Sequence, residues 1–278
     1  MKRKAVFLAI SAVLLFQLPT VSQTYVPLSG RFHLMAEYGF LDVPYHIIQF
    51  GNNGSEINYP DEAGQDILFP FLRLAVRFDI APSHIISVLY QPLSLITEET
   101  TNSSLNIDGV IFPQGTPVRF VYNFPFYRTS YVYLFTKEDS PLMLGVGGAL
   151  QIRNASISFA SLDGTLLRTN RDVGLVPLLE FVAGYRVAEN LWLETDISGI
   201  YAPIRYLNIS DTDVEGALVD ASLRAVVSTQ GPFSLYLNAR YLAGGAEGTS
   251  DPQNPGSDGF VKNWLQFLTL SLGFVLSL

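Results

Sequence analysis

The sequence predicts an all-β fold, an antiparallel up-and-down transmembrane β-barrel of ten strands. Three observations lead to this prediction. Apolar side chains alternate with polar or small ones at a period of two, the spacing of a strand whose faces have different environments. The connections between these segments are long and short in turn. The chain is 48% hydrophobic with a mean hydropathy of +0.26, yet beyond the N-terminus no run reaches the ~18 apolar residues of a transmembrane helix.

The N-terminus has the layout of a secretory signal peptide. Residues 2–4 are basic, an apolar segment over 5–18 follows, and Pro19 breaks it before a group of small residues. This layout predicts a cleaved signal peptide over 1–22 and one mature barrel domain over 23–278. Cleavage removes three basic residues and no acidic ones, so the formal net charge shifts from −8 to −11.

Each predicted strand has a row of mainly apolar side chains at every second position. In chain order the rows run from Phe32 to Phe40, Leu68 to Phe78, Ile86 to Tyr90, Tyr127 to Phe135, Leu142 to Ile152, Leu175 to Tyr185, Leu193 to Tyr201, Val219 to Val227, Phe233 to Tyr241 and Trp264 to Leu278. The strands are predicted over 30–40, 67–80, 84–97, 117–135, 142–159, 173–187, 191–205, 217–228, 232–243 and 260–278. Pro125 predicts a bulge in the fourth strand, because proline has no N–H for the ladder.

The connections sort by length along the chain. Long polar segments follow the odd-numbered strands, over 51–66, 98–116, 160–172, 208–215 and 244–259, and short turns follow the even-numbered ones. A barrel with both termini on one side has this rhythm, with short periplasmic turns and long external loops. A soluble sandwich has no reason to sort its loops in this way. Eight or twelve strands remain alternatives, and an apolar group at 110–112 could extend a strand beyond the membrane.

The other face of the predicted strands carries charges of both signs, which suits a polar lumen better than a soluble core. Because buried charges must be paired, we predict a charge network inside the barrel. Its members are Glu37, Arg73, Arg77, Arg128, Arg153, Glu180, Arg186, Glu194, Asp196, Asp220, Arg224 and Arg240, with Asp79 on the same face. An eight-stranded barrel is just filled by side chains and ten strands leave slightly more room, so a salt-bridged plug and a narrow selective pore both remain open.

The last strand ends in a recognisable pattern. Ser271 and Gly273 are followed by Leu276 and Leu278, which gives polar-x-Gly-x-x-apolar-x-apolar at the end of the sequence. This pattern resembles the C-terminal assembly signal of bacterial outer-membrane β-barrels, which the barrel-insertion machinery reads. Leu278 departs from it, because the usual last residue is aromatic. The resemblance implies insertion into a bacterial outer membrane.

The chain from Pro117 onward, including YRTSYVY at 127–133 and VGLVPLLEF at 173–181, resembles an uncharacterised family of small outer-membrane barrels of Gram-negative bacteria. The resemblance implies the fold and the bacterial outer membrane as location. It implies no activity for particular residues.

Residues suited to chemistry are few. The chain has three histidines, and His46 alone lies near a predicted external rim, where Asp61, Glu62 and Asp66 could pair with it. We find no catalytic motif and predict no cofactor. Acidic stretches at 211–213 and 251–258 offer oxygen ligands of the kind Ca²⁺ takes, but neither has the spacing of an EF-hand loop, so we predict solvated loops and no metal site.

We therefore expect a structural or interaction barrel that acts through its external loops and is not an enzyme. A narrow small-solute or ion channel is the alternative, and an outer-membrane hydrolase is a third possibility. Expected partners are outer-membrane lipid and the barrel-assembly machinery during biogenesis. The formal net charge of −8 argues against nucleic acid, and no external ligand is identified.

Overall fold

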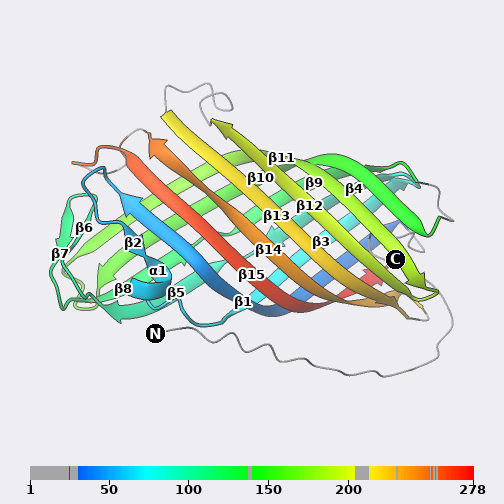
Figure 1. The fold of residues 1–278 in the computed structure, drawn as a ribbon, viewed down its shortest axis with the longest axis horizontal. Coiled ribbons are helices and arrows are strands. Elements are labelled where there is room, and N and C mark those ends of the chain that lie inside the picture. The colour runs from blue at the N-terminus through cyan, green and yellow to red at the C-terminus, as the bar shows by residue number, and fades with distance from the viewer. Residues whose placement is uncertain are drawn as a thin grey trace.

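The computed structural model describes residue 25 and residues 31–136, 140–203, 213–229, 231–250, 252, 254 and 256–278. The predicted signal peptide over 1–22 lies outside these residues, as do 137–139 and 204–212. The strands form a tube in which each is steeply tilted against the long axis (Figure 1). None of the described helices is long and apolar enough to cross a membrane.

The wall of the barrel is a closed antiparallel ring. Its strands are β1 (Phe32–Phe50), β3 (Phe69–Ala81), β4 (His84–Gln91) continued by β5 (Ser94–Thr100), β8 (Pro117–Asn123) continued by β9 (Phe126–Leu134), β10 (Leu142–Ser161), β11 (Leu167–Ala188), β12 (Leu191–Pro203), β13 (Asp213–Ser228), β14 (Phe233–Thr249) and β15 (Phe260–Ser277). β1 pairs with β15, and β10 pairs with β11, which closes the ring. With β4–β5 and β8–β9 each taken as one strand, the described wall has ten strands, which confirms the predicted fold class.

Four short elements gather at one end of the barrel, which we call the loop end. They are β2 (Ile57–Asn58), α1 (Tyr59–Glu62), β6 (Leu105–Ile107) and β7 (Val110–Phe112). The C-terminus lies at the opposite end, the turn end (Figure 1), where Leu278 and Phe32 exchange backbone hydrogen bonds. β7 pairs with β6 in a separate hairpin and does not extend a wall strand.

Prolines mark the irregularities of the wall. Pro92 separates β4 from β5 and Pro125 separates β8 from β9. The two breaks lie side by side, since the Phe124 N–H donates to the Leu93 carbonyl oxygen at 2.7 Å. Pro44 coincides with a register shift between β1 and β15. Because proline cannot donate to a ladder, these are the places where pairing is interrupted. The interruption predicted at Pro125 is present, and it extends to the neighbouring strand.

Several wall strands continue further towards the loop end than predicted. β1 runs to Phe50, β11 begins at Leu167, β13 at Asp213, and β14 ends at Thr249. The predicted loops over 160–172 and 244–259 are therefore too long. The residues in these extensions do not alternate simply between the inside and the outside of the barrel. Ile47 and Ile48 of β1, for example, are both buried. Backbone pairing continues there without the pattern that identified the strands.

The outer face of the barrel is an apolar belt. Side chains predicted to face lipid are exposed around the ring, among them Phe40, Leu72, Leu150, Leu179, Leu223, Leu237 and Leu272. Their neighbours in sequence point inward, as Ser271 and Gly273 do on either side of Leu272. Exposure of so many large apolar side chains suits a bilayer and not water. The strands that carry them form the wall of the tube in Figure 1.

Gly273 of the C-terminal pattern has a local role in packing. It lies opposite Tyr236 of β14, and an ideal β-carbon at Gly273 would be 2.1 Å from the Tyr236 ring. The ring therefore covers the glycine, in the manner by which aromatic side chains shield a strand glycine.

We predict that Gly273→Ala lowers the free energy of unfolding by about 1–3 kcal/mol, because the added methyl group overpacks the contact with Tyr236. Urea titration of the refolded protein, followed by the shift between folded and unfolded bands on SDS gels, measures the change. The same substitution in a Tyr236→Leu background should have a smaller effect. Equal effects in both backgrounds would contradict the role assigned to the ring.

Candidate functional site

The centre of the lumen is crossed by a pair of arginines that share one carboxylate. Asp220 of β13 is buried, and its two oxygens accept hydrogen bonds from Arg240 Nε at 2.6 Å and Arg128 Nη2 at 2.9 Å. Arg240 also donates to Gln91 Oε1 at 2.8 Å, and Arg128 donates to Gln151 Oε1 at 2.7 Å. These side chains come from β4, β9, β10, β13 and β14. The contacts therefore connect opposite sides of the wall.

A second cluster lies around Arg224 of β13. Its guanidinium donates to Glu194 Oε1 at 2.8 Å and pairs with Asp196, both on β12. Glu194 is buried and Asp196 is partly exposed. Glu194 and Arg224 lie directly opposite each other on the two strands, so two members of the predicted charge network are in contact in the structure.

A third cluster surrounds Glu37 of β1. Arg73 Nη1 lies 3.7 Å from Glu37 Oε2, while Asn238 Nδ2 and Ser271 Oγ donate to Glu37 Oε1 at 2.8 and 2.5 Å. The Tyr236 hydroxyl donates to Oε2 at 3.3 Å. Glu37 is 2% exposed. Hydrogen bonds from three neighbours and a nearby guanidinium compensate its burial.

The remaining predicted lumen residues are more dispersed. Arg77 pairs with Asp79 at 2.6 Å, and Glu180 accepts a hydrogen bond from Ser130 at 2.8 Å. Arg186 is exposed at the turn end, with its guanidinium 5.7 Å from the Trp192 ring centroid. Arg153 lies outside these clusters, towards the loop end.

Tyr25, which precedes the first strand, lies in the turn end of the lumen. The Tyr25 N–H donates to Glu194 Oε2 at 3.0 Å, and Arg77 lies 5.6 Å from the centroid of the Tyr25 ring. Tyr25, Arg128 and Glu180 line a cavity of only about 50 Å³. Nothing in the alternation pattern identified Tyr25, since it lies outside any strand.

The loop half of the lumen is apolar, which the sequence did not indicate. Its core combines inward residues of the wall with residues of the short loop elements, and its members include Leu41, Ile48, Ile57, Tyr59, Phe71, Leu95, Ile107, Phe112, Phe120 and Phe159. Most of its wall residues lie on β1, β3, β5, β8 and β10, and it reaches Leu242 of β14 and Phe267 of β15. The external loops therefore pack into the barrel mouth and do not merely extend from it.

His46 belongs to this core. It is fully buried between Tyr59 and Tyr122, each with a ring centroid 4.5 Å away, and its Nδ1 lies 2.7 Å from Gln65 Oε1. The partner is thus an amide and not one of the predicted carboxylates. Asp61 and Glu62 instead accept hydrogen bonds from Asn58.

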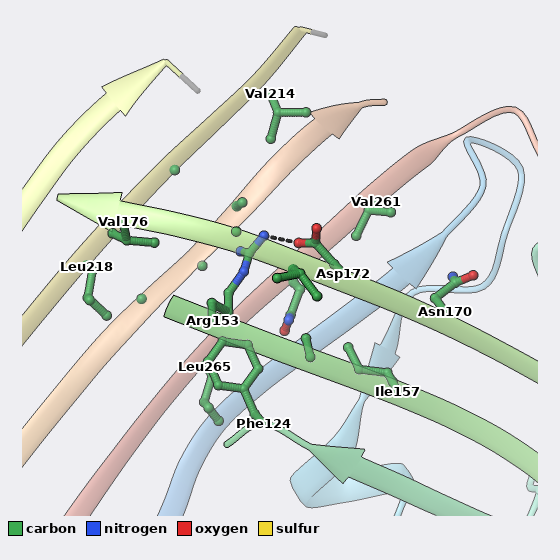
Figure 2. A pocket seen from close by; sticks show the side chains of 18 of the residues that line it. Phe124, Arg153, Ile157, Asn170, Asp172, Val176, Val214, Leu218, Val261 and Leu265 are labelled. Atoms are coloured by element: carbon green, nitrogen blue, oxygen red, sulfur yellow. Dashed lines mark hydrogen bonds and ion pairs between the residues drawn. The ribbon is translucent and has the colours of Figure 1, made fainter. Parts of the chain in front are cut away.

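The other side of the mouth is hollow. A cavity of about 340 Å³ lies against β10 to β15, and we call it the loop-end cavity. Figure 2 shows Arg153 of β10 joined to Asp172 of the neighbouring strand β11 at one wall of the cavity, with Val214, Leu218, Val261 and Leu265 around it. Small residues make this room, since the inward positions of β13 and β14 include Gly216, Gly244 and Ala246.

A pair of side chains separates the two cavities. The loop-end cavity and the small cavity at the turn end share no lining residue, Gln151 lines the first and Arg128 lines the second. The hydrogen bonds between them, at 2.7 and 3.0 Å, form part of the barrier. Among the described residues, then, the lumen is divided.

Within the described ranges, no group of three or more His, Asp or Glu residues is placed to hold a metal ion. Asp211 and Thr212 of one acidic stretch lie outside those ranges. In the other stretch, Asp258 accepts hydrogen bonds from the N–H groups of Asn52 and Phe260 at 2.8 and 3.0 Å. It therefore fastens the β14–β15 connection to the chain after β1.

Comparisons with known proteins place the fold. No family model and no curated protein matches the chain. Among solved structures, the outer membrane protease OmpT of Escherichia coli matches 92% of this chain and 100% of its own, with 12% identity and a TM-score of 0.50. Ail, the attachment invasion locus protein of Yersinia pestis, matches 88% and 99% at 7% identity and a TM-score of 0.38. The chain thus has the fold of a bacterial outer-membrane β-barrel, which agrees with the location predicted from the sequence.

We predict that Asp220→Asn lowers the free energy of unfolding by about 3–5 kcal/mol, because it leaves two buried guanidinium groups without a carboxylate. Urea titration of the refolded barrel measures the loss. Glu98→Gln is the matched control, because Glu98 and its partner Arg119 are 47% and 55% exposed, and an exposed pair contributes at most about 1 kcal/mol. Similar losses in both variants would contradict the central role of Asp220.

The loop end should respond to acid through Asp258. Hydrogen bonds from Phe260 and Asn52 lower the pKa of the Asp258 carboxyl below its usual value. When the pKa of a carboxyl is lower in the folded than in the unfolded protein, its ionised form stabilises the folded state. This stabilisation is complete above the unfolded-state pKa of about 3.9, and it is lost as the pH falls through the folded-state pKa. We expect amide hydrogen exchange at Asn52 and Phe260 to accelerate below about pH 4, beyond the intrinsic pH effect, and Asp258→Asn to remove this acid-dependent step. If the acid-dependent acceleration of exchange persisted in Asp258→Asn, it would have to come from another titrating group.

Proposed function

We propose that this protein is a closed outer-membrane barrel that acts at its loop end, as a binding or interaction protein, and does not conduct solutes. The observation that carries the proposal is the division of the lumen. Arg128 and Arg240 meet on Asp220 and reach Gln151 and Gln91 on other strands. A solute passing through would have to separate buried ion pairs.

The energetic argument supports a plug. Each guanidinium in the lumen centre has a carboxylate or amide partner at 3.0 Å or less. Breaking a buried pair by removing one partner costs about 3–5 kcal/mol, so spontaneous opening of the whole network would be rare. A pore instead needs sites that an ion enters and leaves readily.

The loop end supports a role in binding. There the loops pack into the mouth as an apolar core on one side, and they leave the loop-end cavity of about 340 Å³ on the other. Small-molecule sites are concave, mostly apolar and largely formed before the ligand binds, and the loop-end cavity has this form. The hydrolase alternative has less support, because His46 is buried and paired with Gln65.

We expect the protein to give no discrete current steps in planar lipid bilayers, because the network of Asp220 blocks the lumen. The double substitution Arg128→Ala with Gln151→Ala removes the part of the barrier that directly separates the two cavities and should produce steps, provided that the variant still shows a folded band on an unheated SDS gel.

Arg119→Ala is the matched control, because it removes an exposed arginine of the same barrel and should leave the bilayer silent. Regular steps from the unmodified protein would overturn the proposal in favour of a small-solute channel.

A further inference from the structure

From the pairing of the wall strands we infer that the loop-end cavity opens sideways between β11 and β12, and that it takes up an unbranched hydrocarbon chain from the membrane. The inference rests on the proposed function, since it names what the loop end binds and how the ligand enters. The volume of the cavity, about 340 Å³, is within the range of small-molecule sites, about 300–1,000 Å³.

The strands β11 and β12 pair along only part of their length. Their ladder ends at Leu179 and Gly199, whereas β12 stays paired with β13 as far as Pro203. From Leu167 to Leu178, β11 pairs with β10 alone among the described residues. We call the opening between this edge of β11 and the last residues of β12 the side gap.

Pro177 explains why the ladder stops where it does. Even-numbered residues of β11 bond to β10, as the Arg186 N–H does to the Pro141 carbonyl oxygen, so odd-numbered residues direct their backbone groups towards β12. The register with β12 would place Pro177 opposite Tyr201 in the next hydrogen-bonded pair. Because proline has no N–H to donate, the side gap begins at a position that the sequence determines.

The lining of the loop-end cavity includes both faces of β11 at the side gap. Gly174 and Val176 lie on the inner face of the strand, whereas Val173 and Leu175 lie on its outer face and are 70% and 52% exposed. All four line the cavity, as does Ala217 on the outer face of β13. A lining that continues from one face of a strand to the other passes around its edge. The cavity therefore opens to the outside of the barrel at the side gap.

The surroundings of the side gap are those of a membrane interface. Leu179 and Tyr201, which lie beside it, are exposed like the residues of the apolar belt. Arg171 is exposed on the outer row of β11, just beyond Val173 towards the loop end. A charged side chain on the lipid face is tolerated near the interface and not at the bilayer midplane, and unpaired backbone groups also need polar surroundings. The side gap therefore lies where lipid chains meet their head groups.

The inner lining of the cavity suits a hydrocarbon chain. Val176, Leu218 and Leu265 surround the hollow (Figure 2). Leu242 and Phe267 also line it and belong to the apolar core of the mouth. A chain that enters from the membrane keeps apolar surroundings, and it covers apolar side chains that water would otherwise contact, which is favourable. An entrance among lipid chains thus favours a ligand that is itself dissolved in the membrane.

Carbene labelling of the refolded protein in phosphatidylcholine vesicles tests the inference. Two probes carry the same diazirine group, a phosphatidylcholine with the group in one acyl chain and an alkane of the same chain length. Irradiation inserts the chain into residues that it contacts, and mass spectrometry locates them. Val176 and Leu218 of the cavity should be labelled at least tenfold more than Met143, a buried inward residue of the turn end. Leu223 of the outer belt is the reference for contact with lipid.

The two probes distinguish the possible sources of the chain. Labelling of Val176 and Leu218 by the phospholipid probe would assign the chain to a membrane lipid. Labelling of these residues by the alkane alone would assign it to a free apolar molecule. Both results support the site, whereas labelling by neither probe above the level of Met143 would overturn it.

Ala217→Trp places a large ring at the side gap and should lower the inward labelling, measured relative to Leu223, severalfold. Ala221→Trp is the matched control, because Ala221 lies on the same outer face of β13 and does not line the cavity. It should leave the inward labelling unchanged. Leu175→Trp fills the side gap from β11, and it replaces Ala217→Trp if that variant lacks a folded band on an unheated SDS gel.

Unchanged inward labelling in a folded variant with a filled side gap would overturn the sideways entrance. Failure of the labelling leaves the silent bilayer of the closed barrel untouched. Current steps from the unmodified protein would instead overturn the proposed function and not the side gap.

Discussion

The structure depends on the requirement that charges buried inside the barrel are paired, and the central ones have their partners on other strands. Asp220 meets it with Arg128 and Arg240, and Glu37 meets it with Arg73, Asn238 and Ser271. Lipid outside the wall and close packing at the lumen centre leave these groups no water as an alternative partner. The same contacts that stabilise the lumen therefore obstruct it, so stability and closure have one physical origin.

The parts of the barrel interior differ in polarity and in what they stabilise. The centre of the lumen is polar, and its ion pairs fix the wall strands at known positions relative to one another. Beyond it, the turn end has a smaller apolar cluster that includes Val132, Met143, Trp192 and Val275. The loop half is apolar, and β2, α1, β6 and β7 pack inside the mouth there. The loop-end cavity lies beside this packed frame, where the small residues Gly216, Gly244 and Ala246 leave room.

The sequence predicted the wall better than its contents. Alternation predicted the ten strands because lipid and lumen impose different side chains on successive residues, as Leu272 and Ser271 illustrate. It failed where both faces of a strand are covered, as at Ile47 and Ile48. Tyr59 lies in a segment with the composition of a polar loop, so its burial could not be foreseen. Phe112 belongs to the apolar group at 110–112, which was expected to extend a strand and instead packs into the mouth. The cavity depends on pairing that brings Gly216 beside Ala246, and no local pattern encodes it.

Glu37 also has a consequence for how the ring closes. Ser271 lies on the last strand, Asn238 on the strand before it, and Glu37 on the first. Until the first and last strands meet, this carboxylate lacks its three hydrogen-bond donors Tyr236, Asn238 and Ser271. A slip of two residues would carry Ser271 away from it while leaving the apolar face of the strand towards lipid. The contacts of Glu37 thus favour the correct register between β1 and β15, whereas the apolar pattern alone would also allow a ring shifted by two residues.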